Sequence, residues 1–280
     1  MRIANVSGRL TLVSEQGGID VATESASRFG PDPQAVYGQW ETFREWADGA
    51  PPQGAAVIDT KQLGPPAPRP AQVFAIGMNY RDHAAEAGLA VPASPATFTK
   101  FPTCLTAPFA DVVLPSEVVD WEVELVVVIG VRAQHVSPSS AWDHVAGVTV
   151  GQDLSERVVQ FSSGGQFSLG KSFPGFGPTG PWLVTPDELA DPDDLELGCR
   201  VDDCDVQKSR TSEMVFGVPE LIARLSAVLP LLPGDLIFTG TPAGIGATRQ
   251  PPQFLRPGQV LSSYVEGVGT MASHLVAPPA

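Results

Sequence analysis

Glycine and proline together make up one residue in five of this chain, with 28 of each among 280 residues. Proline fixes φ and removes an amide donor, and glycine is costly inside helices and strands. Breakers at this density divide a chain into short strands and loops, which excludes a helical bundle or a coiled coil. Hydrophobic residues still make up 43% of the chain, so we expect a real core in one large domain or two small ones.

The charge balance is acidic, with 17 Lys and Arg against 31 Asp and Glu and a net charge of −14. Nucleic-acid phosphates are bound by clustered basic residues, and no basic run occurs here, so we expect no nucleic-acid partner. No apolar run approaches the ~18 residues of a membrane span, and residues 1–20 lack the apolar core of a signal peptide. Three sparse cysteines favour reduced thiols, so we expect a cytoplasmic protein without a membrane partner.

Residues 1–70 are predicted to form a small N-terminal subdomain, rich in short strands. Asp32 and Pro33 are typical of a helix start, and apolar residues then recur on one helical face until Gly49. A proline-rich segment, 63–70, forms a stiff linker to the rest of the chain. Strands are expected at 2–6, 9–13 and 18–22.

Residues 71–280 are predicted to form the main domain. Its one long amphipathic helix is indicated at 218–229, before Pro230. Many short strands with few helices favour a mixed β structure of the α+β class over a doubly wound parallel sheet. Strands are expected at 73–76, 112–114, 123–129, 145–150, 182–185, 195–201, 236–239 and 260–265.

Acidic residues lead into the strand expected at 123–129. Because side chains alternate along a strand, Glu122 and Glu124 share one face, and Asp120 can join them. Like charges at neighbouring positions repel, so either solvent bathes this face or a cation is bound there. Carboxylates are hard ligands that suit Mg²⁺ or Mn²⁺, and Asp153, which follows the strand expected at 145–150, offers a third one.

His83 and Glu86 form a second candidate group. In a helix these positions lie on one face, and a carboxylate that holds one imidazole nitrogen raises the basicity of the other. Such a dyad can act as a general base. A surface ion pair on a short helix is the alternative.

Two glycine-rich segments carry weaker signals. Residues 165–172 fit the phosphate-binding loop pattern G-x(4)-G-K-[ST], but the prolines and glycines that follow cannot continue the helix this loop requires. A nucleotide site is therefore a remote alternative. Residues 240–246 follow an expected strand, where backbone amides can meet an anionic group such as a substrate carboxylate, or simply form a tight turn.

In combination, these segments resemble the fumarylacetoacetate hydrolase family, in the C-terminal catalytic domain type shared by its smaller bacterial and organellar members. The resemblance covers about residues 72–275, and its specificity comes from the number, order and spacing of the segments. These are 75–86 (AIGMNYRDHAAE), 98–102, 119–130, 151–157, 170–173, 177–184, 233–246 and 267–269.

The resemblance implies a mixed β-roll that is usually dimeric, so a homodimer is expected. His83 with Glu86 would activate water from a short helix that acts as a lid, and Lys171 would contact the substrate's oxo-acid head or the developing enolate. The roles it implies are the metal ligands Glu122, Glu124 and Asp153, the catalytic residues His83, Glu86 and Lys171, and the substrate-binding residues Arg157, Gln160 and Thr241.

The family's known activities are hydrolysis of acylpyruvates, decarboxylation of oxaloacetate-like acids, and isomerisation of hydroxymuconate-type compounds. A 2-oxo carboxylate can chelate Mg²⁺, which then stabilises the enolate that leaves when a C–C bond breaks. Because both members of the dyad are present, we expect a metal-dependent hydrolase of a small 2-oxo or diketo acid. A decarboxylase or isomerase is the alternative, and a non-catalytic family member is a remote one.

Three residues depart from the family's pattern. Gln152 stands where Asn usually precedes the third metal ligand, Val158 where an Asp often follows the arginine, and Pro174 where an Asp often lies three residues after the lysine. None is an expected metal ligand. The last two remove carboxylates near the site, so its surroundings differ from those of common members.

Overall fold

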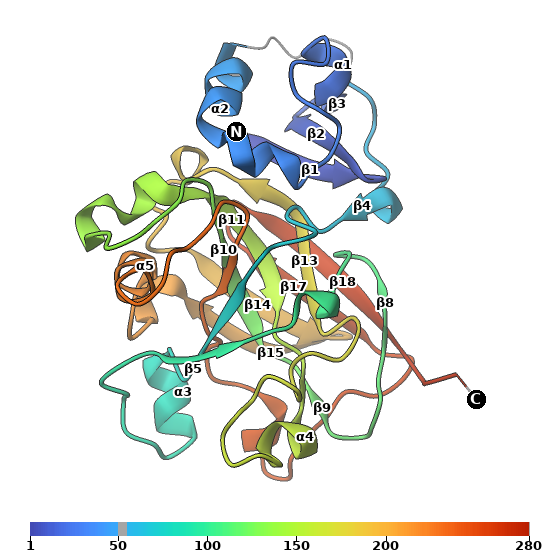
Figure 1. Cartoon of the computed structure of the whole chain (residues 1–280). Helices are drawn as coiled ribbons and strands as arrows, with labels where there is room; N and C mark the ends of the chain where they lie inside the picture. Colours follow the sequence, from blue (N-terminus) through green and yellow to red (C-terminus); the bar gives the residue numbers. More distant parts are fainter. Residues whose placement is uncertain (50–54, 280) are drawn as a thin grey trace.

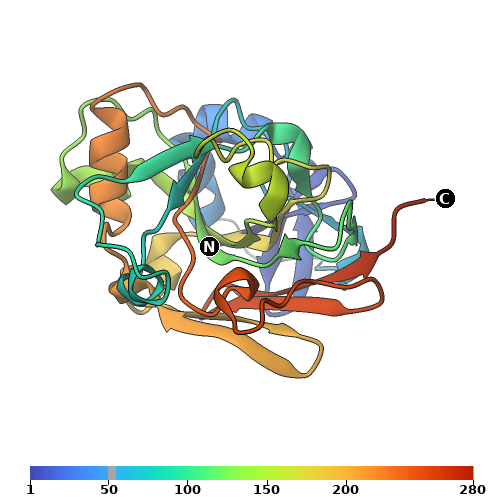
Figure 2. The same ribbon diagram turned by 90° about the horizontal axis from the view of Figure 1, so that it is seen from below.

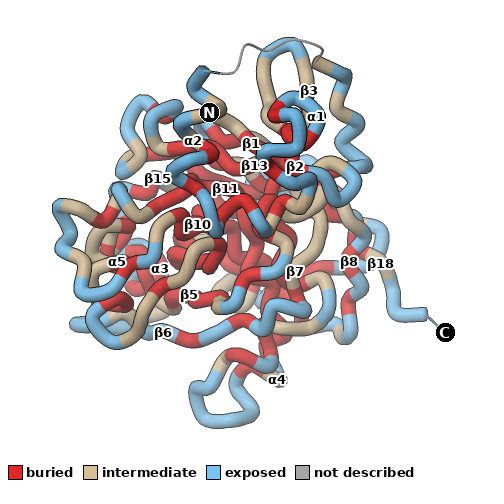
Figure 3. The backbone as a smooth tube through the Cα atoms, turned by 45° about the horizontal axis from the view of Figure 1, so that its top comes forward, coloured by how far each residue is buried: buried red, intermediate tan, exposed pale blue. Residues whose placement is uncertain are grey.

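Apart from Glu124, β10 (Val123–Ile129) consists of apolar, mostly β-branched residues, and every one of its residues is buried. β11 (Val145–Gln152) pairs with it in antiparallel fashion and is buried throughout. In the computed structural model, which describes residues 1–49 and 55–279, these two strands lie at the centre of the molecule (Figure 3). Strands buried on both faces need apolar cover on both sides, and two core clusters provide it.

The larger sheet extends from these two strands in both directions. Its other members are β1 (Arg2–Val6), β2 (Arg9–Ser14), β3 (Gly17–Asp20), β4 (Leu63–Gly64), β5 (Val73–Gly77), β6 (Ala96–Thr99), β7 (Leu105–Thr106), β13 (Gly177–Val184) and β16 (Leu236–Phe238). Their order is β3-β2-β1-β13-β11-β10-β16-β5-β6, with β4 beside β1 and β7 beside β13.

A second sheet packs against one face of the first. Its strands are β8 (Asp111–Val113), β14 (Glu196–Val201), β15 (Cys204–Arg210), β17 (Val260–Val265) and β18 (Gly269–Val276), in the order β15-β14-β17-β18-β8. Leu125 and Val127 of β10 meet Leu197 and Leu261 of this sheet in the larger core cluster. β9 (Val119–Asp120) and β12 (Ser155–Glu156) form a separate two-stranded pair.

The other face of β10 is covered by the N-terminal residues. Val126 and Val128 share a core cluster with Trp40 and Phe43. The β1 strand pairs with β13, so the strands of residues 1–70 continue the larger sheet, as the blue strands in Figure 1 show. The mixed sheets with short helices confirm the predicted α+β class.

Two helix predictions differ from the structure in their limits. Residues 35–39 form a 3-10 helix, and α2 (Trp40–Gly49) continues it, so the helix starts later than Pro33. Asp32 accepts a hydrogen bond from the Gln34 amide, which makes a turn there instead. The prolines after Gly49 lie outside the described residues. The predicted helix at 218–229 is α5 (Val218–Ser226), which gives way to turns after Ser226.

The strand expected at 18–22 also ends early. Asp20 accepts a hydrogen bond from the Thr23 amide and so caps α1 (Val21–Glu24). Other short 3-10 helices occur at Thr60–Gln62, Pro102–Cys104, Pro138–His144, Pro186–Glu188, Thr211–Glu213 and Gly246–Thr248.

Two short helices lie at the end of the molecule away from the N-terminal strands. They are α3 (Arg81–Glu86), which follows β5, and α4 (Arg157–Phe161), which follows β12. Figure 2 looks onto this end. In the described part of the chain, every helix is too short or too polar to cross a membrane.

Candidate active site

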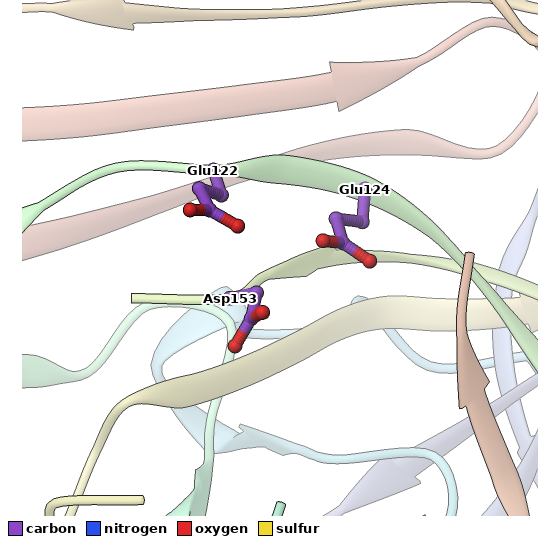
Figure 4. A group of neighbouring side chains, drawn as sticks. All are labelled: Glu122, Glu124 and Asp153. Carbon is purple, nitrogen blue, oxygen red and sulfur yellow. The ribbon is translucent and has the colours of Figure 1, made fainter. Parts of the chain in front are cut away.

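Strand pairing brings the three predicted metal ligands together. β10 and β11 pair Val123 with Gln152. Glu122 directly precedes β10 and Asp153 directly follows β11, so the two residues are neighbours, and the Asp153 amide donates to the Glu122 carbonyl at 2.9 Å. Carboxylate oxygens of Glu122, Glu124 and Asp153 lie within 4.8 Å of one another (Figure 4). All three residues are buried, so the alternative of a solvated acidic face is wrong.

Asp120 does not join this group. Its Oδ2 accepts hydrogen bonds from Arg157 Nε at 2.9 Å and Nη2 at 2.6 Å, and its Oδ1 accepts one from the Gly246 amide at 2.7 Å. Arg157 Nη1 then lies 2.7 Å from Glu122 Oε1 and also donates to Gln160 Oε1 at 2.8 Å. Asp120 therefore orients the arginine that contacts the acid cluster.

Two buried lysines also contact the cluster. Lys171 Nζ lies 2.7 Å from Glu122 Oε2 and 2.5 Å from Asp153 Oδ2. Lys100 Nζ lies 2.7 Å from Asp153 Oδ1 and also donates to the carbonyl of Lys171. Lys100 was not among the predicted site residues, and its only signal was its place in the family segment 98–102.

Burial and charge displace the pKa values of the two glutamates in opposite directions. Burial opposes the ionised form of Glu122, but Lys171 and Arg157 outweigh it and lower its pKa to about 2. Burial, followed by the charges of Asp153 and Glu122, raises the pKa of Glu124 well above its usual range. Among the described residues, no cationic side chain forms an ion pair with Glu124.

This donor set fits a hard divalent cation. Three carboxylates supply oxygen ligands alone, as Mg²⁺ and Mn²⁺ prefer. A divalent ion would also give Glu124 the cationic partner that no described side chain provides. Lys171 contacts two of the same carboxylates, so it would compete with the ion for them.

The predicted dyad is formed on α3. His83 Nδ1 lies 3.3 Å from Glu86 Oε2, and His83 is only 7% exposed, which disfavours the alternative of a simple surface pair. If Nδ1 donates to Glu86, Nε2 is left as the basic nitrogen. The shared face of the short helix thus presents an oriented imidazole, and His83 lines the same cavity as Glu122 and Lys171.

Backbone amides of the glycine-rich loop 240–246 donate hydrogen bonds to carboxylates of the protein itself. The amides of Gly240, Gly244 and Gly246 donate to Glu124 Oε2 at 2.7 Å, Glu86 Oε1 at 3.1 Å and Asp120 Oδ1 at 2.7 Å. A Cβ at Gly244 would lie 2.2 Å from the Val206 carbonyl oxygen, and one at Gly246 would lie 1.8 Å from that of Gln253. Glycine is therefore required at these turns.

Amide side chains hold the backbone around the acids. Gln152, one of the departures from the family pattern, accepts from the Glu122 amide at 2.8 Å and donates to Ser263 Oγ at 2.9 Å. Gln207, which the sequence did not indicate, donates to Thr241 Oγ1 at 2.8 Å. Thr241 Oγ1 in turn donates to the Val123 carbonyl at 2.9 Å, so its hydroxyl is tied to β10.

One cavity of about 560 Å³ joins these groups. Six of the nine predicted site residues line it; Glu124 and Asp153 lie beside Glu122 in the acid cluster, and Glu86 contacts His83. The predicted residues that line it are His83, Glu122, Arg157, Gln160, Lys171 and Thr241. Residues 165–172 follow α4 and form turns, with Lys171 bound to carboxylates, so the phosphate-binding loop is excluded.

Comparison with known proteins agrees with this architecture. A family profile described as "Fumarylacetoacetate (FAA) hydrolase C-terminal" matches residues 72–276. Oxaloacetate tautomerase Fahd2a, mitochondrial, from Rattus norvegicus is 43% identical over 213 residues, which are 75% of this chain and 68% of the rat protein.

Several crystal structures match the whole chain, including the following two. A Mycobacterium smegmatis protein provisionally called HpcE is 52% identical, with a TM-score of 0.95 and 100% of both chains covered. Maleylpyruvate hydrolase from Sphingobium sp. SYK-6, in complex with manganese (II) ion and pyruvate, is 30% identical, with a TM-score of 0.81 and 100% of both chains covered. The family profile spans most of the sequence and both sheets around the acid cluster, and this chain therefore belongs to the fumarylacetoacetate hydrolase family.

Proposed function

We propose that this protein is a Mg²⁺- or Mn²⁺-dependent hydrolase that cleaves a C–C bond in an acylpyruvate or a related β-diketo acid. The observation that carries the proposal is the His83–Glu86 pair, whose buried imidazole lines the same cavity as Glu122 of the acid cluster. The maleylpyruvate hydrolase structure with manganese and pyruvate supports the choice of metal and of the pyruvate head group.

The ion bound by Glu122, Glu124 and Asp153 would polarise the oxygens of the 2-oxo acid head and stabilise negative charge there. Lys171 Nζ, which lies among the same carboxylates, would donate a hydrogen bond to the developing oxyanion. Arg157 is held by Asp120 and keeps Glu122 ionised, so it maintains the charge of the cluster.

His83 would remove a proton from water, which adds to the distal ketone, while Glu86 holds the imidazole in place. The bond between that carbonyl carbon and the adjacent methylene then breaks, and its electron pair stays with the pyruvate fragment. Proton return to that fragment gives pyruvate, and the acyl part leaves as a carboxylic acid. Water is consumed once, and no redox partner is needed.

A second candidate is enol–keto tautomerisation or decarboxylation of an oxaloacetate-type acid, with hydroxymuconate-type isomerisation as a variant. Its support is the oxaloacetate tautomerase from rat, which is 43% identical. This chemistry uses the same carboxylates and Lys171 but needs no activated water, so His83 would be less important.

A substrate panel tests the two candidates. Purified protein with Mg²⁺ or Mn²⁺ is incubated with acylpyruvates and with oxaloacetate, and released pyruvate, carbon dioxide and enol absorbance are followed. Hydrolysis predicts one pyruvate and one carboxylic acid per acylpyruvate consumed, and no turnover in EDTA. Enol conversion of oxaloacetate with every acylpyruvate left intact would contradict the proposal.

The homodimer and the cytoplasmic location also remain proposals. The homodimer is supported by the family, and sedimentation of the purified protein would test it. The rat relative is named as mitochondrial, so localisation in the source cell must be measured directly.

A further inference from the structure

Three phenylalanine rings line the outer part of the active-site cavity in a continuous strip. Phe98 comes from β6, Phe161 from α4 and Phe167 from the turn after it. Phe167 packs edge-to-face with both others, with ring centroids 5.7 Å from Phe98 and 5.7 Å from Phe161. The strip begins at the acid cluster, because Lys171 Nζ lies 5.1 Å from the centroid of Phe98.

Much of the remaining lining is also apolar. Leu89, Ala90 and Pro92, from the segment after α3, contribute to the same cavity. Phe161 is 59% exposed and Leu89 is 58% exposed, so large apolar groups stand open to solvent at its mouth. Exposed apolar surface that continues into a cavity is typical of a binding site for an apolar group.

The cavity's charges are confined to its inner end. Among the described lining residues, the permanently cationic ones are Arg157 and Lys171, and both are already bound to carboxylates of the cluster. The three rings and the segment at 89–92 carry no charge. A carboxylate placed against them would lose water without gaining a partner, which is unfavourable.

We infer that this outer compartment binds an uncharged hydrocarbon group, so the substrate is a 2-oxo acid with a single carboxylate and an alkyl or aryl tail. The inference rests on the proposed function for the position of the oxo-acid head. Oxaloacetate and maleylpyruvate both carry a second carboxylate, so this chain would differ from the two relatives in its substrate.

Binding of a matched ligand pair tests the inference without turnover. The ligands are 2-oxooctanoate and 2-oxooctanedioate, which have equal length and differ by a terminal methyl or carboxylate. Isothermal titration of the Mg²⁺-loaded protein should give a Kd about 30-fold lower for 2-oxooctanoate. Equal affinity, tighter binding of the diacid, or binding of neither ligand while pyruvate binds would overturn the inference.

Two variants locate the effect in the strip. Phe167→Ala should weaken binding of 2-oxooctanoate by about tenfold and leave pyruvate binding unchanged, because pyruvate has no tail. Phe161→Arg should improve binding of 2-oxooctanedioate by roughly three- to tenfold, because it supplies a cation at the mouth.

Val158→Arg is the matched control for the charge. Val158 is 66% exposed on the same helix but does not line the cavity, so the variant adds the same charge outside it. An equal gain in diacid binding from both arginine variants would show a general field effect and contradict the role of the strip.

Turnover of pentanoylpyruvate and glutarylpyruvate, measured in parallel, separates this inference from the proposed function. If neither is hydrolysed but the methyl-tailed ligand still binds about 30-fold more tightly, hydrolysis fails and the tail preference stands. If glutarylpyruvate is hydrolysed with the higher kcat/KM, hydrolysis stands and the tail preference fails.

Discussion

Glu122 and Glu124 lie two residues apart with their carboxylates in one cluster, yet of these two only Glu122 pairs with cationic side chains in the described part of the chain. Lys171 and Arg157 satisfy the first carboxylate, while the second receives a single backbone amide from Gly240. Of the two glutamates, Glu122 therefore has a stabilised ionised form and Glu124 a destabilised one. Replacing each by its neutral amide should affect the metal-free protein in opposite directions.

Glu124→Gln should stabilise the protein in EDTA at neutral pH. The raised pKa of Glu124 means that the folded state binds its proton more tightly than the unfolded state, so ionisation destabilises the fold as pH rises above 4.5. In EDTA, the Tm of the variant should be higher than that of wild type. Addition of Mg²⁺ should raise the Tm of wild type but not that of the variant. Glu45→Gln, at an exposed residue of α2, should change neither.

Glu122→Gln should have the reverse effect. Its pKa is about 2 in the fold against an ordinary 4.5, so its contribution to stability is present above pH 4.5 and lost as pH falls toward 2. At pH 7 the free energy of unfolding of the variant should be about 3–5 kcal/mol lower than that of wild type, since two buried cations lose a partner. Urea unfolding in EDTA measures this. A stability loss in acid as steep as that of wild type would contradict it.

His83→Gln should separate water activation from metal binding. We expect acylpyruvate hydrolysis to fall by about 10²–10⁴-fold, because the general base is lost. The Kd for Mg²⁺, measured by titration calorimetry, should stay within about twofold, since His83 contacts Glu86 and not the acid cluster. Full retention of hydrolysis would contradict the role of His83 as the general base.

Lys171→Met should lower catalysis while leaving Mg²⁺ affinity equal or higher. The lysine contacts Glu122 Oε2 and Asp153 Oδ2, so removing its charge removes a competitor of the ion. We expect kcat/KM to fall by about 10²–10³-fold from the lost oxyanion donor. Lys208→Met, at an exposed lysine of β15, serves as the control. A parallel collapse of metal affinity would assign Lys171 a purely structural role.

The strand prediction succeeded best where the apolar signal was nearly continuous. β10 has the predicted bounds, because its residues are buried throughout. β18 was missed because polar residues alternate with its core side chains Met271 and Leu275, which weakens the apolar signal. The limits of α2 depended on a local competition, in which Asp32 formed a turn with Gln34.

The clustered acids could be predicted from the sequence because spacing along a strand fixes the face on which each side chain lies. Their ion-pair partners could not be predicted, since these depend on which distant segments meet in the fold. Lys100 illustrates this: lysine is almost never fully buried unless paired, and its partner Asp153 is 53 residues away. The glycine loop was expected either to meet an anionic group, such as a substrate carboxylate, or to form a tight turn, and its amides donate to carboxylates of the protein itself.

The pairing of Val123 with Gln152 has a consequence for how this protein can change over generations. A one-residue insertion or deletion in either central strand would turn its carboxylate to the opposite side of the sheet. Such a lesion would destroy the centre in a single step, with no partly working intermediate. Phe161 and Phe167 lie outside the sheets and have no such restraint, so new substrates can be acquired at the rim while the acids are inherited unchanged.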